Sequence, residues 1–243
     1  MDRVRFTEVD STSREARRRI EAGLEAATVF VAARQTGGVG RFGRAWASPA
    51  GGLWLTAAIP TERRAEDLAA GLGLRVGLAA VEAIEAEFGD AERVRLKWPN
   101  DVLIDGKKAA GILCEVVAAR GRTWVVVGVG VNGNFGVDAL PPEMRGRATT
   151  LREAVGADVE LDGLLDSLLA GIKRAVATSA QVDAALLEAV SARMAGVGER
   201  ATVTLADGAV VRGTLLGLGD DGRIRLATET GEFTPPFGAE LSS

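Results

Sequence analysis

Residues 93–132 place four β-strand patterns in succession, joined by connections too short to hold a helix. The patterns are VRLKW, DVLID, KAAGILCEVVAA and TWVVVGVGVN. An Asp-Gly pair ends at Gly106 and an RGR segment spans 120–122, and both are typical of tight hairpin turns. Because hairpins join antiparallel neighbours, we predict an antiparallel meander rather than strands connected by helices.

The remaining patterns add helices and further strands to this meander. Strands are predicted at 3–9, 27–33 and 51–59, and helices at 10–26, 65–88, 161–176 and 181–194. The first helix is expected to begin with a capping box formed by Thr12 and Glu15. The combination predicts an α+β fold, in which a mixed or antiparallel sheet is backed by helices.

The last fifty residues have a different sequence pattern from those before them. The segment AGVGE at 195–199 is a candidate linker, and short strands separated by Asp-Gly turns follow it. We therefore predict two domains, residues 1–195 and 196–243, with the second one forming a small β-barrel.

Composition excludes several kinds of chemistry. The 243-residue chain has no histidine and one cysteine, which rules out a Ser-His-Asp triad, histidine-ligated zinc and an internal disulfide. Any metal must bind to oxygen, which favours Mg²⁺ brought in by a phosphate substrate, and no residue is assigned as its ligand. The net charge of −4 gives no basic field for nucleic acid, and no apolar run is long enough for a membrane span, so a cytoplasmic location is expected.

Two segments match the glycine pattern G-x-G-x-x-G, at Gly38, Gly40 and Gly43 and again at Gly128, Gly130 and Gly133. A dinucleotide-binding turn needs a helix that opens on the third glycine, and neither segment continues into one. The first segment also carries Arg41 and Arg44 between two buried strands. Glycine allows close backbone approach and arginine binds carboxylate or phosphate, so this loop is predicted to wrap a charged ligand; the alternative is a mobile surface loop.

Two further clusters carry polar groups beside a turn. KWPND at 97–101 presents Lys97, Asn100 and Asp101, and GKKAAGI at 106–112 presents Lys108 with small neighbours that leave room for a ligand. Ordinary turn chemistry explains Pro-Asn-Asp equally well, although Trp98 is expected to pack on something. Cys114 is interpreted as a structural thiol, because nothing near it in the sequence would lower its pKa.

In this order and spacing, DSTS, RQTGGVGRFGRAW, KWPNDVLIDGKKAAGILCE and VVVGVGVN resemble the biotin protein ligases. The resemblance implies a catalytic domain distantly similar to lipoate ligases and class II aminoacyl-tRNA synthetases, followed by an SH3-like domain. It implies that biotin and ATP, with Mg²⁺, form biotinyl-5′-AMP, and that a lysine of a biotin carboxyl carrier protein then accepts the biotin. It leaves the oligomeric state open, with a homodimer among the alternatives.

The resemblance also assigns roles to individual residues. It implies that the catalytic groups are Arg41, Lys108 and Asp101. The residues implied to bind biotin, besides Arg41 and Lys108, are Ser11, Thr12, Ser13, Gln35, Gly38, Val39 and Gly40. The residues implied to bind the nucleotide are Arg44, Trp46, Lys97, Asn100 and Asn132.

This chain departs from the family pattern at two positions. Val39 stands where the glycine loop usually has its first arginine, and Ser13 replaces the usual asparagine after Ser-Thr. The chain also starts at the first catalytic strand, so the resemblance predicts a ligase without a DNA-binding domain. The alternatives are a lipoate or octanoate ligase and a catalytically weakened biotin-binding protein.

Overall fold

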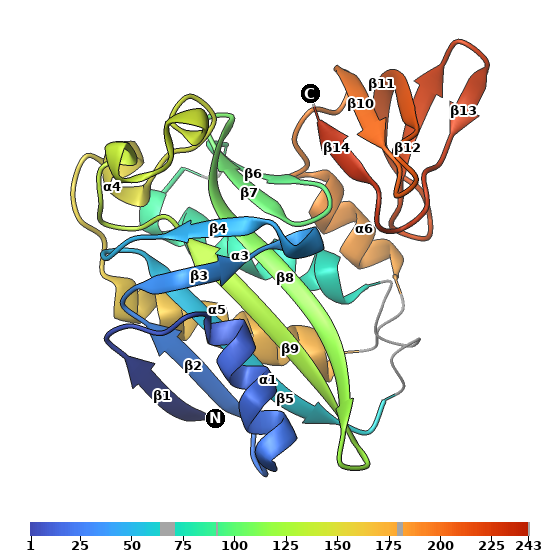
Figure 1. Ribbon diagram of the computed structural model, residues 1–243. Coiled ribbons are helices and arrows are strands. Elements are labelled where there is room, and N and C mark those ends of the chain that lie inside the picture. Colours follow the sequence, from blue (N-terminus) through green and yellow to red (C-terminus); the bar gives the residue numbers. More distant parts are fainter. Residues whose placement is uncertain (64–70, 91, 179–181, 243) are drawn as a thin grey trace.

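The larger part of the fold is a seven-stranded mixed sheet. The computed structural model describes residues 1–63, 71–90, 92–178 and 182–242. The sheet has the order β1-β2-β5-β9-β8-β7-β6 (Figure 1). Only β1 and β2 pair in parallel, and every other neighbour is antiparallel. The strands are β1 (Asp2–Phe6), β2 (Thr28–Ala32), β5 (Leu53–Thr61), β6 (Val94–Lys97), β7 (Asp101–Ile104), β8 (Lys107–Ala119) and β9 (Arg122–Val131). The predicted mixed sheet and the β6–β9 meander are confirmed.

Helices cover the two faces of this sheet unequally. One face carries α3 (Leu72–Phe88) and α5 (Leu161–Ala177), and the other carries α1 (Thr12–Ala22) (Figure 1). Strand alternation explains how β9 serves both faces: Val125 and Val127 join the core under α3 and α5, while Trp124 and Val126 pack with α1. Each buried side chain of this size contributes about 1.5–3 kcal/mol, so the sheet is anchored from both sides.

The N-cap of α1 differs from the predicted capping residue by one position. Ser11 is the N-cap, and its hydroxyl accepts from the Arg14 N–H at 3.4 Å. Thr12 is already helical and its hydroxyl bonds to Gln35, while Glu15 bonds to Arg18 and Arg19. The predicted Thr12 and Glu15 capping box is therefore wrong, because both side chains have other partners.

The glycine-rich segment is a hairpin. It consists of β3 (Gln35–Val39), a 3₁₀ turn (Arg41–Gly43) and β4 (Ala45–Ser48), and these two strands form a sheet of their own. The hairpin is tied to the chain just before α1, because the Gly37 N–H donates to the Asp10 carbonyl at 2.7 Å. Sequence pattern predicted only a loop here, since glycine-rich strands carry a weak β signal.

The other predicted helices are confirmed with shifted ends. Residues 64–70 and 181 lie outside the described residues, so the first part of the 65–88 helix and the start of the last one are not compared. The last helix, α6 (Ala184–Ser191), ends three residues early. A short helix, α4 (Leu151–Val155), and two 3₁₀ turns at Val137–Ala139 and Pro142–Met144 had no sequence signal. Within the described residues, no helix is long and apolar enough to cross a membrane.

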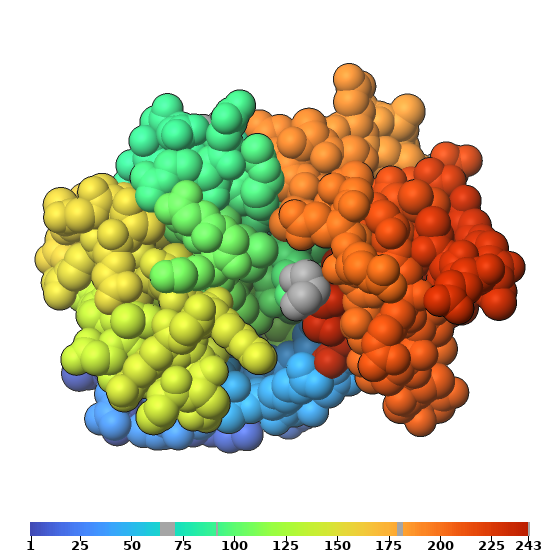
Figure 2. All heavy atoms as spheres, turned by 90° about the horizontal axis from the view of Figure 1, so that it is seen from above, coloured from blue at the N-terminus to red at the C-terminus, as the bar shows by residue number. Residues whose placement is uncertain are grey.

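A five-stranded antiparallel sheet in the order β13-β12-β11-β10-β14 follows the linker and is consistent with an SH3-like domain. Its strands are β10 (Arg200–Thr204), β11 (Val210–Leu218), β12 (Ile224–Thr228), β13 (Gly231–Phe233) and β14 (Glu240–Ser242). Figure 2 shows these residues as a lobe beside the rest of the chain. Trp98 is 3% exposed and its indole N–H donates to the Gly222 carbonyl at 3.2 Å, which explains the buried aromatic in the 97–101 turn. The division into domains 1–195 and 196–243 stays a prediction.

Candidate active site

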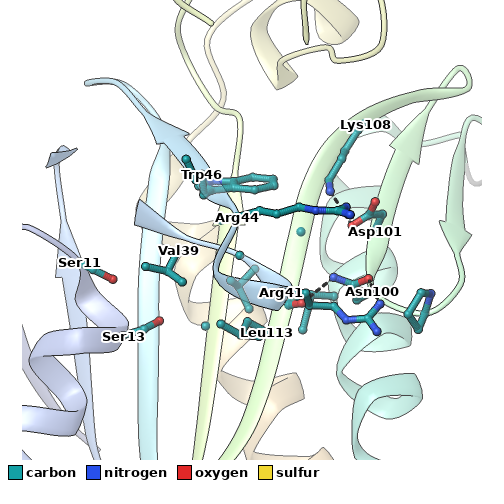
Figure 3. A pocket seen from close by; sticks show the side chains of 18 of the residues that line it. Ser11, Ser13, Val39, Arg41, Arg44, Trp46, Asn100, Asp101, Lys108 and Leu113 are labelled. Carbon is teal, nitrogen blue, oxygen red and sulfur yellow. Dashed lines mark hydrogen bonds and ion pairs between the residues drawn. The ribbon is translucent and has the colours of Figure 1, made fainter. Parts of the chain in front are cut away.

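A cavity of about 290 Å³ opens on the α1 face of the sheet, between β3–β4 and the β6–β7 turn (Figure 3). Its floor is made by glycines. Gly128 and Gly130 follow Trp124 and Val126 on the same face of β9, and Gly111 of β8 pairs with Gly130. A Cβ on Gly130 would lie 2.5 Å from the Trp46 indole nitrogen, and one on Gly111 would lie 2.9 Å from the same ring. The second G-x-G-x-x-G match is thus a pair of strand glycines that make room, not a dinucleotide turn.

Uncharged polar side chains form one end of the cavity. Ser11, Thr12, Ser13 and Gln35, which are among the residues implied to bind biotin, line this end. Behind them lies Thr56 of β5, which is fully buried and within 2.8 Å of the Thr12 hydroxyl and 3.0 Å of the Ser13 hydroxyl. Sequence reasoning missed Thr56, since a threonine inside a buried strand ordinarily indicates only β propensity.

Lys108, Asp101 and Trp46 meet at the opposite end. The Lys108 Nζ lies 2.7 Å from Asp101 Oδ1 and 5.0 Å from the centre of the Trp46 ring (Figure 3). The β7–β8 hairpin brings the lysine and the carboxylate together, because Lys108 pairs with Leu103, two residues along β7 from Asp101, and its long side chain spans that interval. The Trp46 indole N–H is enclosed against Gly130 and has no hydrogen-bond partner among the described residues.

Arg41 adds a second cation from the tip of the hairpin. Its Nη1 donates to Asn100 Oδ1 at 3.2 Å, and its guanidinium lies 4.8 Å from the Phe42 ring centre (Figure 3). Burial lowers the pKa of Arg41, and the nearby Glu240 and Asp101 carboxylates act in the opposite direction. Among the described residues the Arg41 guanidinium has its hydrogen bond to a neutral amide and only indirect support from two carboxylates, so this half-buried cation would attract a bound anion strongly.

The C-terminal sheet supplies a residue that the sequence did not indicate. Glu240 at the start of β14 lines the cavity, and its Oε2 lies 2.6 Å from the Arg44 Nη2. Leu241 lines the cavity beside it. No local motif surrounds Glu240, and only the packing of the last sheet against the glycine hairpin brings it to the site.

Three of the implied site residues do not line the cavity. Gly38 lies within the hairpin, where a Cβ would lie 2.7 Å from the Ser48 hydroxyl. Lys97 stands opposite Asp101 in the β6–β7 register. Asn132 is 2% exposed and donates to the Thr149 carbonyl at 3.0 Å, which ties the end of β9 to the segment before α4. The other twelve implied residues are gathered around one cavity: Ser11, Thr12, Ser13, Gln35, Val39, Gly40, Arg41, Arg44, Trp46, Asn100, Asp101 and Lys108.

Cys114 is not part of this cavity, and we expect its thiol to be inert. Burial, assisted by the Glu115 carboxylate, raises its pKa to about 12. Iodoacetamide at pH 8 should leave it unmodified in the folded protein and alkylate it in urea, as mass spectrometry would show. Because the folded state holds the proton more tightly, its contribution to stability is complete below about pH 9 and is lost as pH rises towards 12. Stoichiometric alkylation of the native protein at pH 8 would contradict the structural role.

Comparison with known proteins gives consistent results. The sequence profile of the Biotin/lipoate A/B protein ligase family matches residues 5–132. The biotin–[acetyl-CoA-carboxylase] ligase of Paracoccus denitrificans is 33% identical over 239 residues, which cover 93% of this chain and 95% of that protein. The bifunctional ligase/repressor BirA of Bacillus spizizenii is 35% identical over 167 residues and 66% of this chain. The aligned part spans about half, 49%, of that BirA relative.

Solved structures share the same fold over nearly the whole chain. The biotin protein ligase from Aquifex aeolicus in complex with biotin and ATP superposes with a TM-score of 0.84 and 30% sequence identity, covering 99% of this chain and 98% of that one. Its apo structure gives a TM-score of 0.78 with 28% identity and the same coverage. The similarity therefore includes both sheets.

Proposed function

The chain belongs to the biotin/lipoate A/B protein ligase family, and from this premise we propose that it is a biotin–protein ligase. In the first step, a biotin carboxylate oxygen attacks the α-phosphorus of ATP, which forms biotinyl-5′-AMP and releases pyrophosphate. In the second step, the neutral ε-amine of a lysine attacks the acyl carbon and AMP leaves. The relatives named as biotin–[acetyl-CoA-carboxylase] ligases support a biotin carboxyl carrier protein as the acceptor.

One observation carries this proposal: a single cavity joins an uncharged polar end to a cationic end. Thr12, Ser13 and Gln35 suit a neutral head group, whereas Arg41 and Lys108 suit a carboxylate and a phosphate meeting at the far end. The reaction needs positioning of two anions and neutralisation of the charge that develops at phosphorus. Arg41 and Lys108 can position the anions and neutralise their charge without an imidazole, in keeping with a chain that has no histidine.

The acceptor lysine is proposed to enter near Asp101. In the structure this carboxylate forms an ion pair with Lys108, so an incoming ammonium would compete for the same oxygen at the place where the acyl phosphate forms. Asp101 would then orient the amine as it loses its proton. A homodimer and a cytoplasmic location stay predictions.

Mg²⁺ is proposed to arrive with ATP as part of the substrate. Among the described residues, no group of three or more cysteine, aspartate or glutamate side chains could hold a metal ion. The carboxylates that line the cavity are Asp101 and Glu240, and both already contact cations. This donor set fits a metal held mainly by phosphate oxygens and water, which is the usual state of Mg²⁺ at nucleotide sites.

Exchange of labelled pyrophosphate into ATP tests the proposal directly. The purified protein is given biotin, lipoate or octanoate as the sole acid, and we expect exchange with biotin alone. Exchange with lipoate or octanoate instead would make it a ligase for those acids. No exchange with any acid, in a protein that still binds biotin, would identify a binding protein.

Val39 provides a prediction about retention of the intermediate. Val39 lines the cavity from β3, opposite Ala45, so an arginine there would reach the bound adenylate. One added charge-assisted hydrogen bond contributes about 1.5–3 kcal/mol, so we expect Val39→Arg to slow release of biotinyl-5′-AMP by about ten- to a hundredfold. Val39→Gln is the control for side-chain length without charge. An unchanged off-rate for the arginine variant, measured by filtration of the labelled adenylate, would refute this role.

A further inference from the structure

Hydroxyl groups at the uncharged end of the cavity form a continuous chain. Thr12, Ser13 and Thr56 lie within 3.0 Å of one another along the path Ser13–Thr56–Thr12, and Thr12 contacts Gln35. Each hydroxyl has one proton to donate. The direction of every hydrogen bond in the chain can therefore be worked out once one end is fixed.

The Gln35 amide fixes that end. The Thr12 backbone N–H lies 2.8 Å from one amide atom of Gln35, and a backbone N–H can only donate, so this atom is the oxygen Oε1. The amide nitrogen then donates to the Ser48 hydroxyl at 2.8 Å, which donates to the Trp46 carbonyl at 3.1 Å. This side of the network is consistent with the same orientation.

The direction now follows from group to group. The Thr12 hydroxyl lies 3.0 Å from the same Gln35 oxygen and must donate to it, which uses its proton. Thr56, 2.8 Å away, must then donate to Thr12. Ser13, 3.0 Å from Thr56, must in turn donate to Thr56. Ser13 is thereby left with its lone pairs only.

We infer that Thr56 is a specificity-determining positioning residue, which makes the Ser13 hydroxyl an obligate hydrogen-bond acceptor towards the ligand. An acceptor at this point selects a head group that presents an N–H donor, such as a ureido nitrogen of biotin, over a head group without one. This inference rests on the proposed function, since it names the feature of the substrate that the site reads. Thr56 touches no ligand itself and acts through Ser13.

The floor of the cavity supports this geometry. A Cβ on Gly128 would lie 3.0 Å from the Ser13 Oγ and 3.6 Å from the Thr56 Oγ1, so glycine at this position leaves space for both hydroxyls. Thr56 is fully buried, and its hydroxyl has no access to water that could replace either partner. The chain of donors is therefore fixed before the ligand arrives.

Calorimetric titration of the whole protein tests the inference with biotin and its two isomers methylated on one ureido nitrogen. Thr56→Val keeps the branched shape and removes the hydroxyl, and Thr56→Ser is the matched control that keeps it. We expect Thr56→Val to raise the Kd for biotin roughly tenfold, and Thr56→Ser to stay within about twofold of the wild type. The wild type should bind one methylated isomer much more weakly than biotin, and Thr56→Val should narrow that ratio.

The outcomes separate this inference from the function it rests on. Two results for a folded Thr56→Val protein would overturn the inference alone. One is an unchanged Kd for biotin, and the other is an equal fold-increase of the Kd for biotin and for both methylated isomers. Failure of the wild type to bind biotin would overturn both. If Thr56→Val does not fold, Ser13→Ala at the half-buried partner takes its place, with the same tenfold loss expected and an unchanged Kd overturning the inference.

Discussion

Replacing Lys108 with alanine is expected to lower the rate of pyrophosphate exchange by about a hundred- to a thousandfold, which is typical of removing one preorganised group that stabilises transition-state charge. Lys108 lines the end of the cavity where carboxylate and phosphate would meet, together with Arg41 and Arg44, and its ammonium contacts Asp101 and the Trp46 ring. The alanine variant also leaves the Asp101 carboxylate facing the anions without its partner, which adds repulsion to the lost attraction.

Lys107 offers a matched control for this experiment. It is the preceding residue, it is exposed, and it does not line the cavity. Lys107→Ala removes the same charge from the same strand and should leave exchange within about twofold of the wild type. An equal loss of exchange rate in the two variants would show that the reaction depends on the overall positive charge of this strand and not on a group at the reacting atoms.

Gly130→Ala is expected to raise the KM for ATP by about ten- to a hundredfold. The added methyl group would lie 2.5 Å from the Trp46 indole nitrogen, so the ring must leave its place against β9. The resemblance implies that Trp46 binds the nucleotide, and we propose that its ring stacks on the adenine, since stacking of a base on an aromatic side chain contributes about 1–3 kcal/mol. Steady-state exchange kinetics at varied ATP give the KM, and biotin binding measured by calorimetry should change little.

Gly146→Ala is the corresponding control, since a Cβ at that glycine would meet nothing within 4 Å. It makes the same chemical change outside the sheets, in the turn that follows the Pro142–Met144 3₁₀ turn. A normal KM for ATP in Gly130→Ala would mean that Trp46 has no part in nucleotide binding. A parallel rise in both variants would point to a loss of stability, which thermal unfolding would detect.

The sequence predicted those parts of the site in which local chemistry is unusual. Arg41 among glycines, Asp101 in a Pro-Asn-Asp turn and Lys108 beside small residues each break an ordinary pattern, and all three line the cavity. The meander could be predicted equally well, because hairpin turns determine which strands are neighbours. Turn chemistry and local charge depend on residues that are close together in the chain, so both features can be read from a single sequence.

Thr56 and Glu240 could not be predicted, for the opposite reason. A threonine inside a strand looks like an ordinary strand residue until the sheet register shows which side chains lie beside it. Glu240 depends on how the five-stranded sheet packs against the glycine-rich hairpin, which no local pattern records. The predicted capping box was wrong for a related reason. The Thr12 hydroxyl forms hydrogen bonds with Gln35 and Thr56 rather than with its own helix.

The Arg44–Glu240 pair joins residues 196 positions apart and links the glycine-rich hairpin to the five-stranded sheet beside the cavity. Contacts of such large sequence separation form late in folding, because the entropy of closing the intervening chain must be met before the contact stabilises anything. The seven-stranded sheet can therefore be complete while the cavity still lacks one wall. In a variant that keeps Trp124 and carries phenylalanine at the other three tryptophan positions, we expect refolding followed by ligand binding to lag behind refolding followed by fluorescence, because Trp124 lies in the core between α1 and the sheet.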